Sequence, residues 1–142
     1  MKTNKLTLSM IGVMLLALIL TACAPSSANA QQELGGRVWV LRSMAGQPAL
    51  EGTHPTLEFD FDEMSIGGNA TCNSYFGGFE VKGQELTISE TGATLMACAE
   101  QDRMQQESDF FRALSEVTAY QIVNGELHLL LGEGQALIFT AE

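Results

Sequence analysis

Residues 67–78 read GGNATCNSYFGG and place one cysteine and two asparagines among four glycines. Cys72 lies in the middle of this stretch, and a second cysteine, Cys98, ends the segment TLMAC at 94–98. Four roles are open to Cys72: a nucleophile, a metal ligand, half of a disulfide, or an ordinary loop residue. The rest of the chain bears on which role is correct.

The chain begins with a segment typical of export. Residues 1–22 open with Lys2 and Lys5 and continue as an apolar run, LTLSMIGVMLLALIL, that leads to LTAC at 20–23. This is the layout of a secretory signal. The uncharged stretch 6–24 is also close to the ~20 residues that a membrane-spanning helix needs. The ending LTAC resembles a bacterial lipobox, and it favours a lipoprotein signal over a membrane span.

The lipobox resemblance implies a lipid anchor on Cys23. Diacylglycerol would be attached to its sulfur, the chain cleaved before it, and the new amino terminus acylated with a fatty acid such as palmitate. Ala24 at the following position implies delivery to the outer membrane, facing the periplasm, in a two-membrane bacterium. The small polar residues after Cys23 predict a flexible tether. We therefore expect a signal peptide at 1–22, a lipidated tether at 23–35, and a folded domain at 36–142.

The charge balance excludes one class of partner. Removal of Lys2 and Lys5 leaves five Lys and Arg against seventeen Asp and Glu, which is a net charge of −12. This is the wrong sign for binding a phosphate backbone, so no nucleic-acid partner is expected. The acids are spread along the chain, which indicates an acidic, well-solvated surface.

Several short segments of the domain predict strands. The alternation in TLEFDFD (56–62) places Leu57, Phe59 and Phe61 on one face of a half-buried strand. Asn124-Gly125 is typical of a tight type I′ turn between two strands. The remaining predicted strands are RVWVLRS (37–43), GFEV (78–81), ELTIS (85–89), AYQIV (119–123), ELHLLL (126–131) and ALIFTA (136–141), with turns at 82–84 and at GEGQ (132–135).

One helix is predicted, over about residues 100–118. Its periodicity places apolar side chains on one face and charged side chains on the other. The apolar face would carry Met104, Phe110, Phe111, Leu114, Val117 and Thr118, and the charged face Glu107, Arg112 and Glu116. Strands, one helix and further strands, joined by short connections, indicate an α+β, mainly β fold. We expect a small antiparallel, barrel-like curled sheet with that one helix.

The sequence gives little support for catalysis or metal binding. A cysteine nucleophile needs a base within hydrogen-bond reach, and the only histidines are His54, in a turn, and His128, on the predicted solvent side of a strand. Neither cysteine is part of a close Cys-x-x-Cys pair of the kind that binds zinc. The segment DFDE (60–63) lacks the glycine of a calcium loop, where Ile66 stands. We therefore expect no enzyme activity, metal or cofactor.

The two domain cysteines form an even pair in an exported chain. With Cys23 lipidated, Cys72 and Cys98 remain, and an oxidising compartment favours joining them. A bridge would restrict the unfolded chain by about 3 to 4 kcal/mol in the chain-entropy model. The disulfide is favoured over the alternative, which is two buried free thiols.

These residues resemble a META domain, the family of the heat-inducible HslJ lipoproteins. The resemblance rests on two motifs, TCNSYFGGF at 71–79 and TLMAC at 94–98, although Thr71 and Ala99 stand where the family usually has Gly and Pro. It implies a barrel-like sheet with one helix and an association with heat shock and envelope stress, and it brings no catalytic residue. The matching positions are Cys72, Asn73, Tyr75, Gly77, Phe79, Thr94, Met96, Ala97 and Cys98.

With the resemblance, the stretch 67–78 is interpreted as an architectural turn. Its glycines would let the backbone reverse, Asn73 would hydrogen-bond its own turn, and Tyr75 and Phe79 would anchor it in the core. The expected function is a non-catalytic envelope lipoprotein, a binding or structural module in stress tolerance. It would act through a sheet face or the 63–78 loop, and an exposed aromatic patch at Tyr75 or Phe76 would favour this.

Two alternatives remain for the function. One is a binder of small hydrophobic ligands in the mouth of the barrel, as in lipocalins. The other is an inhibitor of an envelope enzyme.

Overall fold

The computed structural model describes residues 27–142. The predicted signal peptide at 1–22 and the lipid anchor at Cys23 lie outside the described residues. Within residues 27–142, no helix has the length and apolar composition required to cross a bilayer.

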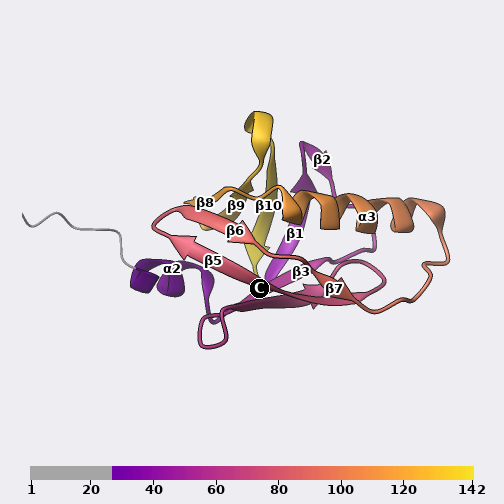
Figure 1. Ribbon diagram of the computed structural model, residues 1–142. Coiled ribbons are helices and arrows are strands. Elements are labelled where there is room, and N and C mark those ends of the chain that lie inside the picture. The colour runs from indigo at the N-terminus through magenta and orange to yellow at the C-terminus, as the bar shows by residue number, and fades with distance from the viewer. Residues whose placement is uncertain (1–26) are drawn as a thin grey trace, which may run out of the picture.

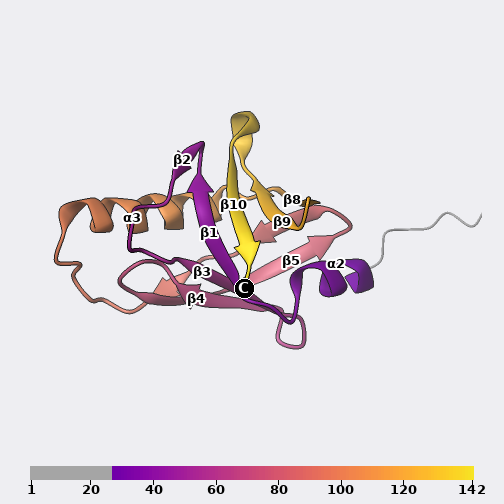
Figure 2. The same ribbon diagram turned by 180° about the vertical axis from the view of Figure 1, so that it is seen from behind.

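The domain is a ring of antiparallel strands (Figure 1). Ten strands form one sheet, and the ring closes because β1 pairs with β10 as well as with β3. Figure 2 shows β1 and β10 side by side. The predicted antiparallel, barrel-like sheet is thus confirmed. The strands are β1 (Trp39–Met44), β2 (Gln47–Pro48), β3 (Thr56–Asp60), β4 (Ser65–Asn69), β5 (Ser74–Lys82), β6 (Glu85–Ile88), β7 (Gly92–Ala93), β8 (Ala119–Val123), β9 (Glu126–Leu130) and β10 (Ala136–Ala141).

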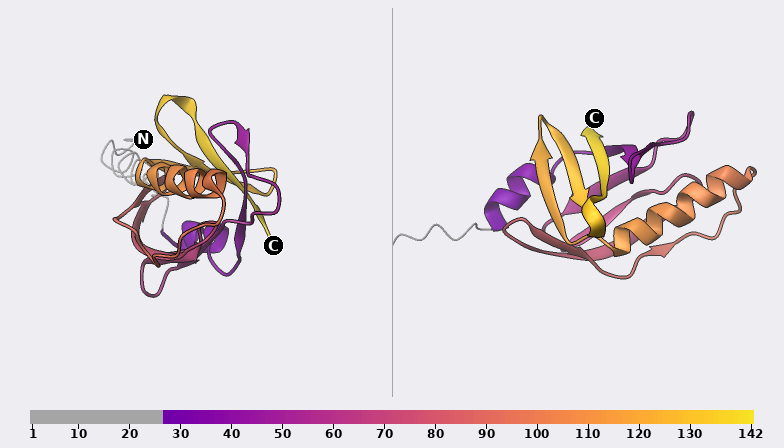
Figure 3. Two further views of the ribbon diagram at one scale, coloured as in Figure 1. Left: turned by 90° about the vertical axis from the view of Figure 1, so that its right-hand side faces the viewer. Right: turned by 90° about the horizontal axis from the view of Figure 1, so that it is seen from above.

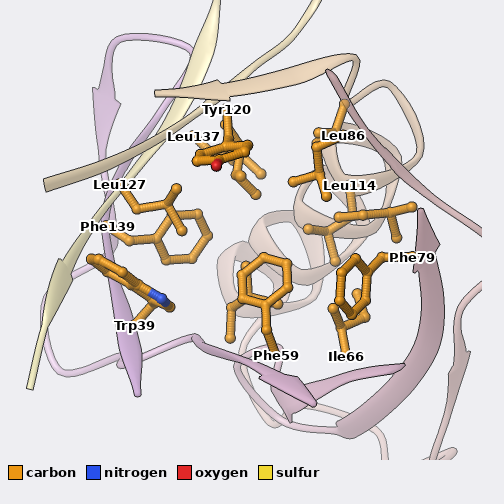
Figure 4. Close-up of a cluster of buried hydrophobic side chains, with 14 of the residues drawn as sticks. Trp39, Phe59, Ile66, Phe79, Leu86, Leu114, Tyr120, Leu127, Leu137 and Phe139 are labelled. Atoms are coloured by element: carbon orange, nitrogen blue, oxygen red, sulfur yellow. The ribbon is translucent and has the colours of Figure 1, made fainter. Parts of the chain in front are cut away.

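Large apolar side chains fill the inside of this ring (Figure 4). Alternate residues of each strand point inward, as the period of two in a strand requires. The Trp39 ring is fully buried, and its Nε1 donates a hydrogen bond to the Leu34 carbonyl at 3.0 Å. The largest fully buried members include Trp39, Phe110, Tyr120, Phe139, Leu34, Leu57, Leu86, Leu114, Leu127, Leu129 and Leu137.

Helix α3 (Gln101–Ser115) lies between β7 and β8 in the chain and packs against the ring, as the view along its axis shows (Figure 3). The helix is confirmed, but its predicted faces are partly wrong. Glu107, expected in solvent, is only 9% exposed, and Met104, expected in the core, is 52% exposed. The prediction of the two faces used hydrophobicity alone, whereas this helix buries polar groups that have hydrogen-bond partners.

A second helix, α2 (Ser27–Leu34), occupies part of the predicted tether. The flexible tether expected at 23–35 is therefore wrong from Ser27 onward. Ala30 and Leu34, one helical turn apart, are buried in the core, and the Tyr120 hydroxyl donates to Glu33 Oε2 at 2.8 Å. The sequence SANAQQEL is mostly polar, but these two positions are enough to bury one face. The folded unit thus begins before residue 36.

The hairpin turns are largely as predicted. Asn124 (φ 54°) and Gly125 (φ 85°) both have the positive φ that a type I′ turn requires. Ala45 and Gly46 take the same signs between β1 and β2. A short 3-10 helix, η1 (Gly132–Gly134), joins β9 to β10 at the predicted turn GEGQ.

The expected loop at 63–78 is wrong. It contains strand β4 and the first half of β5, and the reversal is confined to residues 70–73, where Ala70 N donates to the Asn73 carbonyl at 2.7 Å. All four glycines of GGNATCNSYFGG lie in strands, so they do not make the turn. Glycine has low intrinsic strand propensity, and here the strand pairing overrides it. A Cβ on Gly68 would lie 2.2 Å from the Thr56 carbonyl oxygen, so the close approach of the two backbones requires glycine.

We expect Gly68→Ala to destabilise the domain by about 2 kcal/mol or more, because the added methyl would force β3 and β4 apart. Gly132→Ala is the matched control, since a Cβ there meets nothing within 4 Å. Urea unfolding of both variants measures the difference. Equal unfolding midpoints would show that the two strands separate at no cost.

The raised pKa values of Tyr75 and Tyr120 predict that the domain loses stability at alkaline pH. Burial, with the charge of Glu58 as a second cause, raises the pKa of Tyr75 above its ordinary value of 10.0. Burial, followed by the hydrogen bond to Glu33 and the charge of Glu33, raises the pKa of Tyr120. Above pH ~10 the unfolded chain loses these protons and the folded chain keeps them, so the free energy of unfolding falls as pH rises, by up to ~1.4 kcal/mol per pH unit for Tyr75 alone.

Urea unfolding between pH 8 and pH 11 measures this slope. A variant with Tyr75→Phe and Tyr120→Phe should lose stability less steeply above pH 10, whatever its stability at neutral pH. An unchanged slope would mean that other groups cause the alkaline loss.

Candidate functional site

A disulfide holds the turn after β4. Cys72 and Cys98 are joined, with their Cα atoms 5.6 Å apart, as predicted. The bridge connects the 70–73 turn to the segment between β7 and α3, and both cysteines are half-buried. It therefore ties two neighbouring connections at one end of the barrel.

The Glu107 carboxylate lies beneath the same turn. Its Oε2 accepts hydrogen bonds from the backbone N–H groups of Cys72 and Asn73, both at 2.9 Å, and its Oε1 accepts from Asn73 Nδ2 at 2.5 Å. Three N–H donors thus replace the water that this buried acid has lost. Sequence reasoning missed Glu107, although its spacing from Phe110 and Leu114 puts it on the buried face.

Asn73 connects the turn to the segment before Cys98. Its Oδ1 accepts from Thr94 Oγ1 and Met96 N, both at 2.7 Å, and its Nδ2 donates to the Met96 carbonyl at 3.0 Å. The expectation that Asn73 bonds its own turn is wrong. Asn69 takes that role, since its Oδ1 accepts from Thr71 N at 3.0 Å. Asn73, Thr94 and Met96 of the two sequence motifs are therefore brought together.

Gln106 holds a further loop beside Glu107. Its Nε2 donates to Thr53 Oγ1 and Thr71 Oγ1, both at 2.9 Å, and its Oε1 accepts from Leu50 N at 2.7 Å. Thr71 has a φ of 144°, a positive value that glycine adopts more easily than threonine. Thr71 therefore has a backbone conformation for which glycine is better suited.

Cys72, Cys98 and Glu107 form a cluster whose atoms are of the kinds that bind metals, but the two cysteines are not in the chemical state that metal binding requires. The two sulfurs and a Glu107 carboxylate oxygen all lie within 4.8 Å of one another. The sulfurs are bonded to each other, so neither is the thiolate that a metal needs or that a nucleophile must be. His54 is exposed, and His128 lies on the outer row of β9, half-buried, with its Nε2 3.7 Å from Glu126 Oε2. The cluster fits a structural role.

Exposed apolar side chains lie next to this cluster. Phe76 is 69% exposed, and Leu95 and Met96, which follow β7, are 100% and 62% exposed. Tyr75 and Phe79, the other aromatic residues of β5, are buried as predicted. Of the two candidates for an exposed aromatic, Phe76 is therefore the one on the surface.

Phe76 belongs to a row of directly paired residues across four strands. Glu58 pairs with Gly67, Gly67 with Phe76, and Phe76 with Gly92. Directly opposite residues point to the same face of a sheet, so these four, which we call the Phe76 row, share the outer face. A Cβ on Gly92 would lie 2.7 Å from the Phe76 ring, so the ring lies over that glycine. The residues that pair with Phe76 in the two neighbouring strands are both glycines, so the sheet surface beside its aromatic ring is flat.

A cleft of about 860 Å³ borders the Phe76 row. Its walls are the end of α2, residues 35–38, β3 and β4. Glu58 and Gly67 belong both to the cleft lining and to the row, so the cleft and Phe76 are neighbours. The charged residues of the lining are Glu58, Asp60, Asp62 and Arg37.

We expect Glu107→Ala to cost about 3 kcal/mol or more, because it leaves three N–H donors without their acceptor. Glu107→Gln should cost less, since its amide oxygen still accepts. Exposed Glu116→Gln is the control. Thermal unfolding under non-reducing conditions compares the stability of the three variants. If Glu107→Ala loses no more stability than the control, Glu107 does not stabilise the turn.

Comparison with known proteins agrees with this architecture. A model of the META domain family matches residues 32–142. No curated protein matches the sequence. An NMR structure of a protein from Burkholderia xenovorans has 27% identity and a TM-score of 0.63, covering 86% of this chain and 92% of its own. A second NMR structure has 24% identity and a TM-score of 0.61, with 77% and 92% coverage.

A third solved structure has a lower sequence identity but a similar fold. The crystal structure of a DUF4847 family protein from Bacteroides vulgatus has 13% identity and a TM-score of 0.57, covering 78% of this chain and 96% of its own, which shows a shared fold. The family model covers most of the chain, and the segments TCNSYFGGF and TLMAC meet at the disulfide and Asn73. The chain belongs to the META domain family.

Proposed function

We propose that this protein is a non-catalytic lipoprotein of the cell envelope that binds a partner through the Phe76 row and supports the envelope under stress. A lipid on Cys23 would anchor it, on the periplasmic side of the outer membrane in a two-membrane bacterium. The observation that carries the proposal is the exposure of the Phe76 ring on a flat face of paired strands. Aromatic side chains of this kind supply much of the affinity at protein interfaces.

The surroundings of Phe76 support a binding role because they are rigid. The turn that precedes β5 is fixed by the disulfide and by the three hydrogen bonds to Glu107. A surface that is already ordered loses little conformational entropy when a partner binds.

The alternative of a hydrophobic ligand inside the barrel has less support. A lipocalin-like site needs open space within the ring, and among the described residues the ring interior is occupied by Trp39, Phe110, Tyr120 and Phe139 together with leucines. The inhibitor alternative would present the 63–78 segment to an envelope enzyme. Binding without chemistry is favoured because the two domain cysteines are bonded to each other.

A photo-crosslinking amino acid at position 76 tests the proposal in the host cell. We expect crosslinking to an envelope protein in the membrane fraction from position 76 and not from exposed position 118. Cys23→Ser should abolish labelling by radioactive palmitate and release the protein from the membrane.

A strain that lacks the protein provides the functional readout. After heat challenge, the unmodified protein and Glu116→Gln should restore survival, whereas Phe76→Ser should not, although its unfolding temperature is unchanged. Equal crosslinking from both positions, or full rescue by Phe76→Ser, would overturn the proposal.

A further inference from the structure

We infer that the Phe76 row and the adjoining cleft bind a basic peptide segment, one that carries arginine or lysine beside apolar residues. This inference rests on the proposed binding function and names the chemistry of the partner. The occupant is identified from the charges that face the cleft, the shape of its floor and the position of the aromatic ring.

The cleft carries an excess of negative charge. Glu58, Asp60 and Asp62 line it, all three are exposed, and within residues 27–142 none of them forms an ion pair. Asp60 Oδ1 accepts from the backbone N–H groups of Asp62 and Glu63, at 2.9 and 3.0 Å, which fixes this carboxylate in place. Three carboxylates in a cleft attract a cationic partner.

One cation, Arg37, also lines the cleft, but it has contacts of its own. Its Nη2 donates to the Gln32 carbonyl at 3.4 Å, and its guanidinium lies 5.5 Å from the centre of the Trp39 ring. Within residues 27–142, Arg37 forms no ion pair with a carboxylate of the cleft. The β3 wall therefore keeps its negative charge.

The floor beside these acids suits a peptide. Gly67 separates Glu58 from Phe76 in the row, and it has no side chain to obstruct an approaching backbone. Two strand spacings, roughly 9.6 Å, separate the Glu58 and Phe76 backbones. One extended peptide can therefore place a cationic side chain at Glu58 and a second cationic or apolar side chain over the Phe76 ring, where a guanidinium gains a cation–π contact.

Other occupants fit this surface less well. A metal ion would use the carboxylates but leave the Phe76 ring and most of a cleft of about 860 Å³ without a role. A second copy of this acidic chain would bring few cations to the cleft, since the chain has only seven Lys and Arg. A basic peptide uses the carboxylates, the glycine floor and the ring together.

The test is a titration of the full chain, purified in a non-ionic detergent, with a hexapeptide of alternating arginine and leucine. The matched probe replaces each arginine by citrulline, which keeps the shape and removes the charge. We expect the arginine peptide to bind at least fivefold more tightly than the citrulline peptide, and its affinity to fall as salt rises. Amide NMR shifts should change at Gly67 and Phe76.

Variants separate this site from general attraction to an acidic protein. A protein with Glu58→Gln and Asp60→Asn should bind the arginine peptide about fivefold more weakly, and Phe76→Ala about threefold more weakly. Glu116→Gln removes one exposed charge elsewhere and should leave binding unchanged. Equal binding of the citrulline peptide, or an equal loss in Glu116→Gln, would overturn the inference.

The remaining outcomes distinguish the partner chemistry from the proposed function. Crosslinking from position 76 without binding of the arginine peptide would leave the binding function standing and reject a basic partner. Calcium ions competing fully with the peptide would reject a peptide site in favour of an ion site. Protein dimers crosslinked through position 76 would identify a second copy as the occupant, also against the inference.

Discussion

The structure depends on one buried carboxylate. Glu107 lies on the inner side of α3 and accepts hydrogen bonds from two backbone N–H groups and one side-chain amide of the turn between β4 and β5. A buried acid is costly unless such donors surround it, so the helix and the turn must be positioned together. Because Asn73 also forms hydrogen bonds with the backbone of Met96, the helix, the turn and the segment before Cys98 form one unit. The disulfide adds a covalent link to contacts that the polar groups already specify.

This arrangement leaves the outer face of the neighbouring strands free to carry a surface for a partner. The inner side of β5 is committed to the core by Tyr75 and Phe79, whereas Phe76, one residue along, points outward. Gly67 and Gly92, which pair with Phe76 on either side, keep the face flat. One segment of sequence thus serves the core, the turn and the exposed face through its alternation.

The sequence predicted the sheet well because strand alternation and turn residues are local signals. TLEFDFD, Asn124-Gly125 and the disulfide pair all follow from neighbouring residues or from the even number of cysteines left in the domain. The hydrogen-bond partners of Glu107 and Asn73 were missed because they lie far along the chain, where no local pattern reveals them. Strand β4 was missed for a related reason, since Ser65–Asn69 contains two glycines and forms a strand only because β3 and β5 supply its hydrogen bonds on both sides.

Helix α2 affects how the proposed lipid anchor would be connected to the domain. Its side chains Ala30 and Leu34 are part of the core, so α2 belongs to the folded unit. With a lipid on Cys23, only residues 24–26 would lie between the anchor and α2, and four extended steps span at most ~14 Å. If the lipid is attached, so short a connection would keep the domain from reaching across the width of the compartment around it. It would sample a thin layer next to the lipid headgroups in a narrow range of orientations, which raises its effective concentration toward neighbours in the same membrane.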